Sequence, residues 1–180
     1  MIQAIAPQLT LVVAALAMIV VARRIKSAGV SATVTILAAI MAAICARWIS
    51  WDDGYARFFQ ILFAINLALT ALISVRHVTE EKIPAAEYYI LLALATTGMM
   101  FAASAKDLLT LYLGLELMAL CSYILVGICR DRPKANEAAF KYFVLGSFAS
   151  AILLYGISLT YGLTRAIDLD AIAKAISEPG

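Results

Sequence analysis

Six apolar runs alternate with short polar links along this chain, and this alternation constrains its fold more than any other feature. Each run is long enough to cross the hydrocarbon core of a bilayer as an α-helix, which takes about 20 residues. The links are short, so consecutive helices must run antiparallel. The expected spans are residues 2–22, 30–49, 58–75, 86–104, 108–129 and 138–163.

Composition supports a membrane location. Of the 180 residues, 64% are hydrophobic and 14% are charged, whereas a soluble domain averages about 25% charged residues. The first run has no basic residue before it and is too long for the apolar core of a signal peptide, so we predict an uncleaved first transmembrane helix. The sequence therefore predicts an all-α integral membrane protein with about six transmembrane helices.

The basic residues in the links predict the orientation of these helices. If the N-terminus lies outside, the inner links carry eight Lys and Arg residues and the outer side carries five. Cytoplasmic loops are enriched in Lys and Arg, so this bias favours an N-terminus on the outside. The inner group is Arg23, Arg24, Lys26, Arg76, Lys82, Arg130, Arg132 and Lys134.

Two of the apolar runs carry a charged residue inside the membrane. Glu116 lies in the middle of run 108–129, and Lys141 lies near the beginning of run 138–163. An ionisable group in hydrocarbon costs at least about 2.5 kcal/mol, so it needs a partner, a wet cavity or a function. Because burial favours the neutral form of a carboxyl, Glu116 is suited to accept and release protons. We predict a proton-handling site made of Glu116 and Lys141.

Hydroxyl groups surround this predicted site. Tyr112 and Tyr123 share the helix face of Glu116, and Tyr155 lies close to the face of Lys141. We expect an axial offset of about 8 Å between Glu116 and Lys141, which long side chains and water can bridge. Further hydroxyls project from the last run at other angles: Ser147, Ser150 and Ser158.

Two purely structural interpretations compete with this prediction. Glu137 and Lys141 are four residues apart in the favourable order, so Lys141 can instead pair with Glu137 at the membrane surface. A protonated Glu116 can instead form a purely structural hydrogen bond between helices. Both alternatives remain open at the level of sequence.

Other patterns predict neither a metal site nor a cofactor site. The three cysteines are separated along the chain without a CxxC pair, and there is a single histidine, His77. No phosphate loop or dinucleotide fingerprint occurs. After the last run, residues 164–180 have apolar positions at helical spacing, with Asp168 and Asp170 near the start, and we predict a short amphipathic helix at the membrane interface.

The two charged runs also carry a family resemblance. The segment DLLTLYLGLELMALCSYILVG, followed by EAAFKYFVLGSFASAILLYGISLTYG, closely resembles the N-subunit family of bacterial proton-pumping NADH–quinone oxidoreductase, respiratory complex I. This family belongs to the antiporter-like membrane subunits. The resemblance is specific over residues 107–162 and looser before them. It implies that Glu116 is the glutamate of the central proton path and that Lys141 is the lysine of the following helix.

The resemblance carries expectations for the whole fold. Family members have about fourteen helices that include two inverted repeats, so this chain looks like the N-terminal part only and is expected to be truncated. Residues 1–85 then form an N-terminal three-helix segment, 86–163 the start of the proton-translocating repeat, and 164–180 the interfacial tail.

The resemblance also implies a cellular setting. The chain is expected in the bacterial plasma membrane with the other membrane subunits of complex I, with protons as the transported ion and no nucleic acid as partner. NAD, FMN, iron–sulfur clusters and quinone are expected on other subunits. The alternatives are a subunit of a multisubunit cation/proton antiporter or a membrane-bound hydrogenase, and a structural membrane spacer.

Overall fold

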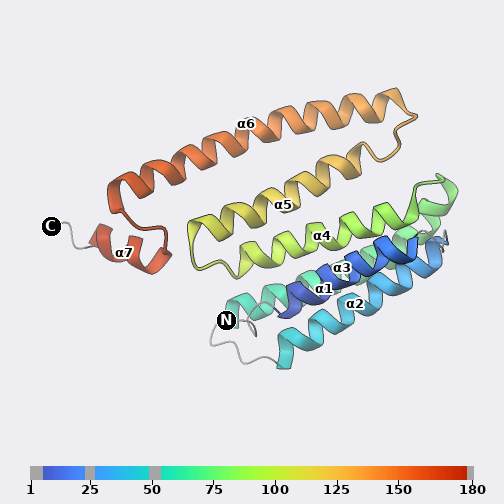
Figure 1. The fold of residues 1–180 in the computed structure, drawn as a ribbon, viewed down its shortest axis with the longest axis horizontal. Helices are drawn as coiled ribbons and strands as arrows, with labels where there is room; N and C mark the ends of the chain where they lie inside the picture. The colour runs from blue at the N-terminus through green and yellow to red at the C-terminus, as the bar shows by residue number, and fades with distance from the viewer. Residues whose placement is uncertain (1–5, 23–26, 49–53, 178–180) are drawn as a thin grey trace.

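The computed structural model describes residues 6–22, 27–48 and 54–177, and these residues form seven helices (Figure 1). Consecutive long helices run antiparallel, as the short links predicted. The helices are α1 (Ala6–Ala22), α2 (Ala28–Trp48), α3 (Gly54–Glu80), α4 (Ala85–Ala103), α5 (Leu108–Val126), α6 (Pro133–Thr164) and α7 (Leu169–Ser177).

The first four helices form a bundle, and the remaining helices are added to one side of it. In Figure 1, α5 lies between α4 and α6, and α6 forms the outer edge of the molecule. The short helix α7 turns back beneath the end of α6 and lies close to the start of α5 (Figure 1). As a result, α5 is covered on two sides by other helices, whereas α6 is exposed along most of its length.

Five helices, α2 to α6, are long and apolar enough to cross a membrane. The apolar part of α1 covers Ala6–Ile19, which is shorter, and the predicted run 2–22 begins in residues outside the described part of the chain. The all-helical membrane fold is therefore as predicted, while the sixth span remains a prediction.

Small residues form much of the bundle core and let the helices approach closely. One core cluster contains Ala38, Ala39, Ala42 and Ala64 around the fully buried Leu11. The closest approach is between α4 and α5. A Cβ atom added to Gly98 would lie 2.6 Å from the carbonyl oxygen of Gly114, so the two backbones are in direct contact there. Small residues at helix interfaces permit this kind of packing in membranes.

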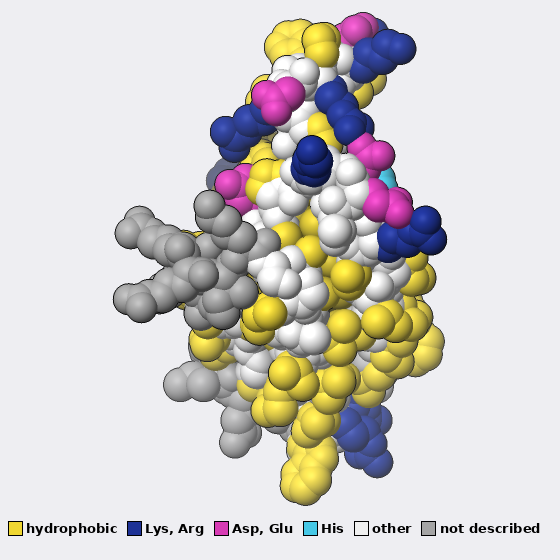
Figure 2. Space-filling model, turned by 90° about the vertical axis from the view of Figure 1, so that its right-hand side faces the viewer, with side chains coloured by type: hydrophobic (Ala, Val, Ile, Leu, Met, Phe, Trp, Pro, Cys, Tyr) yellow, Lys and Arg dark blue, Asp and Glu magenta, His cyan; other side chains and the backbone are white. Residues whose placement is uncertain are grey.

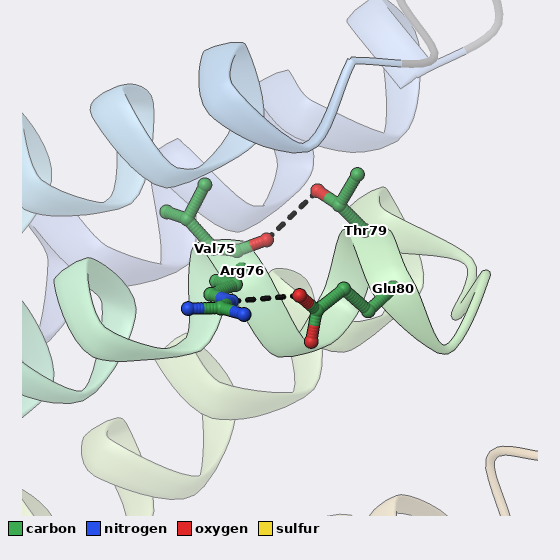
Figure 3. A network of polar contacts seen from close by, with 4 residues as sticks. All are labelled: Val75, Arg76, Thr79 and Glu80. Carbon is green, nitrogen blue, oxygen red and sulfur yellow. Dashed lines mark hydrogen bonds and ion pairs between the residues drawn. The ribbon is translucent and has the colours of Figure 1, made fainter.

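Several helices extend beyond the apolar runs predicted from sequence. Run 58–75 was among the shortest expected, but α3 continues to Glu80. Its last turns are stabilised by side chains, since Thr79 donates to the carbonyl of Val75 at 2.8 Å and Arg76 pairs with Glu80 at 2.6 Å (Figure 3). Hydropathy marks the part of a helix that lies in hydrocarbon, and hydrogen bonds of this kind continue the helix into polar surroundings.

The end of α4, the start of α5, the end of α6 and the start of α7 meet at one end of the molecule (Figure 1). Leu108 N donates to the carbonyl of Ile167 at 2.9 Å, and Leu169 N donates to the carbonyl of Lys106 at 3.0 Å. These two backbone bonds connect the link before α5 with the link after α6. Asp168 then caps α7 by accepting from two backbone N–H groups at 3.0 Å, which agrees with the predicted helix start.

The opposite end of the molecule is held by an ion pair between distant links. Arg132, just before α6, donates to Glu81, just after α3. The hydrogen bond and the positive charge of Arg132 lower the pKa of Glu81. Figure 2 looks onto this end, where Lys, Arg, Asp and Glu side chains gather on the upper part above a mostly hydrophobic lower part.

Candidate functional site

Glu116 lies half-buried on α5, which is fixed against α4 through Gly114 on one side and faces α6 on the other. Its Oε1 accepts a hydrogen bond from the hydroxyl of Ser150 on α6. The same Ser150 oxygen lies 3.0 Å from the hydroxyl of Tyr112, one turn before Glu116 on α5. Tyr112, Ser150 and Glu116 therefore form one connected polar group between two spanning helices.

The contacts between α5 and α6 set the register of the two helices. Glu116 is level with Ser150, and Lys141 precedes Ser150 by nine positions on α6. At about 1.5 Å per residue, Lys141 lies about 13 Å from Glu116 along the helix axis. This separation exceeds the offset of about 8 Å expected from the apolar runs, because the contact with Ser150 shifts α6 along α5.

Lys141 is paired within its own helix. Its Nζ donates to Glu137 Oε1 at 2.5 Å, and both side chains are exposed. This is the pairing that the helical spacing offered as an alternative. Within the described residues, no ion pair joins Lys141 to Glu116. The role of Lys141 in a proton path therefore remains a prediction.

The other predicted tyrosines lie apart from the carboxyl. Tyr123 packs edge-on against Tyr142, with ring centroids 4.8 Å apart, and against Phe143 at 5.7 Å. Its hydroxyl fills the space above Gly146, so a Cβ added to Gly146 would clash with it. Tyr155 is 66% exposed on α6. Of the three tyrosines, Tyr112 is the one that the structure connects to Glu116 through a side chain.

Ser150 is the site residue that the sequence analysis did not single out. It was noted only as one of three further hydroxyls on its run. In an antiparallel helical hairpin, residues equally far from the turn lie at the same level. Glu116 lies ten residues before the end of α5 at Val126, and the residue ten positions after Pro133 is Phe143, so this rule pairs Glu116 with Phe143. Neither the level of Ser150 nor the rotation that turns it toward α5 therefore follows from the sequence pattern.

The described residues contain no group of three or more His, Cys, Asp or Glu side chains that could hold a metal ion. Near the end with both termini, α6 diverges from α5 and leaves an open apolar groove of about 480 Å³. Residues of α5, α6 and α7 line it, among them Leu108, Gly156 and Ile172. This groove offers packing surface and little polar chemistry.

These features define a class: a multi-pass membrane protein in which hydroxyl groups hold a carboxyl between two spanning helices. Residues 105–179 match the family described as NADH:quinone oxidoreductase/Mrp antiporter, transmembrane. The matched segment contains both Glu116 and Lys141.

Curated relatives and a solved structure agree with this match. NADH-quinone oxidoreductase subunit N 2 of Rhizobium meliloti is 48% identical over 126 residues, which is 70% of this chain and 26% of the relative. NADH-quinone oxidoreductase subunit N of Trichlorobacter lovleyi is 42% identical over 128 residues, 71% of this chain and 26% of the relative. A chain of respiratory complex I from Thermus thermophilus superposes with a TM-score of 0.76 at 26% identity, covering 97% of this chain and 39% of that chain.

Residues 105–179 thus match the family that the charged runs resemble, and the resemblance predicted from these runs is confirmed. The chain is a multi-pass protein of the bacterial plasma membrane. It spans about a quarter of the length of the curated relatives that it matches.

Proposed function

We propose that the chain is part of a membrane subunit of a proton-pumping NADH–quinone oxidoreductase, where it contributes to proton translocation coupled to quinone reduction. One observation carries this proposal: a carboxyl in the middle of a spanning helix, Glu116, is held by a hydroxyl from the next helix, inside the segment that matches the family. The names of the relatives support the same enzyme. The redox groups, NAD, FMN, iron–sulfur clusters and quinone, belong to other subunits.

Glu116 is the group that takes up and releases the proton. A serine hydroxyl can donate to a carboxylate and can equally accept from a carboxylic acid. The contact with Ser150 is therefore compatible with both protonation states of Glu116. Placing such a group in a helix of low polarity is expensive, which supports a function rather than a structural role.

Lys141 and Glu137 form the second ionisable part of the proposed path, toward the charged end of the molecule. Their exposed side chains exchange protons with water, and water molecules span the distance of about 13 Å to Glu116. With the N-terminus outside, this charged end faces the cytoplasm. Proton entry then occurs at Lys141, and the other membrane subunits of the complex cover the rest of the path.

The test is the substitution Glu116→Gln in the assembled complex. Glutamine keeps the shape and can still accept from Ser150, but it cannot release a proton. We expect an assembled complex whose proton pumping into liposomes falls about tenfold or more, in line with the loss of a proton-transfer group. Glu80→Gln is the control, because Glu80 is an exposed partner of Arg76. Normal pumping by the Glu116→Gln complex contradicts the proposal.

A second candidate function rests on the family description, which also includes the Mrp antiporters. The same architecture then exchanges a cation for protons, or serves a membrane-bound hydrogenase, without quinone chemistry. Quinone-dependent NADH oxidation by the complex that co-purifies with this chain discriminates between them. A structural spacer is the third possibility. In that case Glu116→Gln leaves transport unchanged, whereas Glu116→Leu lowers stability.

A further inference from the structure

The hydrogen bonds around Ser150 have one possible direction when Glu116 is ionised. A serine hydroxyl has one hydrogen, which Ser150 then donates to the Glu116 carboxylate. The hydroxyl of Tyr112, 3.0 Å from the Ser150 oxygen, must then be the donor in that contact. The order is therefore Tyr112 to Ser150 to Glu116, an unbroken chain of O–H groups that ends on the carboxylate.

We propose that Ser150 links Glu116 to Tyr112 as a proton relay that leads from the middle of the membrane toward the start of α5. This inference rests on the proposed function of Glu116 and adds a route on its far side. Tyr112 lies one turn nearer the end with both termini, whereas Lys141 lies in the opposite direction along the hairpin. Glu116 then stands between an entry side and an exit side.

The proton balance of the relay closes without any redox partner. When Glu116 becomes protonated, the hydroxyls first rotate so that Glu116 donates to Ser150, Ser150 to Tyr112 and Tyr112 to a water molecule. The O–H bond of Glu116 then breaks as a new bond forms to the Ser150 oxygen. The original Ser150 hydrogen passes to the Tyr112 oxygen, and Tyr112 releases its own hydrogen to a water molecule. One proton leaves Glu116 and one reaches water, and every hydroxyl is restored. The transfer itself returns the chain to its starting direction.

The surroundings of Glu116 leave few competing routes. Within the described residues, Ser150 is the one side chain that hydrogen-bonds Glu116. On α4 there is no titratable side chain between Ile90 and Ala105, the stretch that contains its contact with Gly114. The other titratable groups of the hairpin helices that lie toward the entry are Cys121, Tyr123, Lys134, Glu137, Lys141 and Tyr142. Toward the exit, Tyr155 and Tyr161 on α6 are exposed, and neither hydrogen-bonds Glu116.

The test compares four variants in the purified complex, reconstituted into liposomes. Ser150→Ala and Tyr112→Phe each break the relay, and we expect each to lower the rate of proton pumping about tenfold. Ser150→Thr keeps a hydroxyl on the same backbone position and should recover most of the rate. Ser147→Ala is the matched control, because Ser147 is exposed on α6. It should pump like the unsubstituted complex.

A spectroscopic readout separates positioning from general damage. The carboxyl stretching band of Glu116, assigned by its loss in Glu116→Gln, should shift to higher wavenumber in Ser150→Ala and stay in place in Ser147→Ala. If Glu116→Gln abolishes pumping while Ser150→Ala or Tyr112→Phe pumps normally, the relay is wrong and the proposed function stands. If Glu116→Gln pumps normally, the proposed function itself fails. Equal pumping by Ser150→Thr and Ser150→Ala also overturns the relay.

Discussion

Asp107 shows how a single residue starts the helix that carries the site. Its carboxylate accepts from the backbone N–H of Thr110 at 2.8 Å and from the Thr110 hydroxyl at 2.7 Å. These bonds, the backbone one first, lower the pKa of Asp107 below its usual value of 3.8. They also occupy a donor that the first turn of a helix leaves without a partner. The cap therefore fixes where α5 begins.

We expect Asp107→Ala to lower the free energy of unfolding by about 1 kcal/mol, the usual cost of a lost cap. Asp107→Asn should retain most of the stability, since asparagine caps equally well. Thermal unfolding of the polypeptide in detergent at neutral pH measures both. Equal melting of the Ala and Asn variants would show that the cap contributes nothing.

The same cap has a defined pH dependence. Because folding lowers the pKa of Asp107, its stabilisation is complete above the unfolded pKa of 3.8 and disappears as the pH falls through the lower folded pKa. The Asn variant should lack this part of the acid sensitivity.

Among individual residues, the sequence identified the charged side chains of the site better than the side chains that hydrogen-bond them. Glu116 stands out because it is a charge in an apolar run, and Lys141 with Glu137 follows from helical spacing. The pairing of Glu116 with Ser150 depends on how α6 is rotated about its axis, which packing between helices determines. Helical spacing places Tyr155 close to the face of Lys141. That face of α6 is largely exposed, so Tyr155 projects outward and does not join the site.

Helices α4 and α5 are in direct backbone contact, and two glycines, Gly98 and Gly114, make this contact possible. A Cβ on Gly98 would meet backbone atoms of α5 at 2.6 and 2.7 Å, and one on Gly114 would meet α4 at 2.7 Å. Backbone atoms cannot move aside as a flexible side chain can. Any larger residue must therefore push the two helices apart, which also displaces Glu116 relative to the bundle.

We expect Gly98→Ala to lower the free energy of unfolding by about 1–3 kcal/mol, the range for overpacked interiors. Gly156→Ala on α6 is the control, because its added Cβ meets no atom within 4 Å. It should be neutral or slightly stabilising, since alanine favours helix more than glycine. Thermal unfolding of both variants in the same detergent gives the comparison. Unchanged melting of Gly98→Ala would contradict the close backbone contact.

Helix existence was predictable from hydropathy, and helix ends were not. The run 86–104 nearly matches α4 (Ala85–Ala103), since Pro84 and Ser104 flank it closely. The run 138–163 misses the first residues of α6, because Pro133 is well suited to a first helical turn and the polar residues after it remain helical. A helix continues wherever its backbone bonds can be completed, whether or not the residues are apolar.

At the scale of the whole molecule, the distribution of charge predicts the sidedness of the membrane. The end that carries the Glu81–Arg132 pair also carries the basic residues Arg76, Lys82, Arg130 and Lys134, whereas α1 begins and α7 lies at the other end (Figure 1). From the positive-inside bias we expect the start of α6 on the cytoplasmic side and α7 outside.

Cysteine labelling tests this orientation. In a variant whose native cysteines are replaced by serine, Asp131→Cys should react with a membrane-impermeant maleimide only in inside-out vesicles. Asp170→Cys on α7 should react only in right-side-out vesicles, and both positions are exposed. The reversed pattern would mean that the N-terminus lies in the cytoplasm.

The backbone bonds that join residues 106–108 to 167–169 have a mechanical consequence for the α5–α6 hairpin. At the other end, the turn between the two helices holds them together, and the Glu81–Arg132 pair fastens this turn to the link after α3. With both ends fastened, α6 cannot swing away from α5 as a rigid rod, so any separation must come from bowing near its centre. Ser150 lies in that central part, between Gly146 and Gly156. We expect water to reach Glu116 by flexing of the helix middle while both membrane surfaces of the hairpin stay closed.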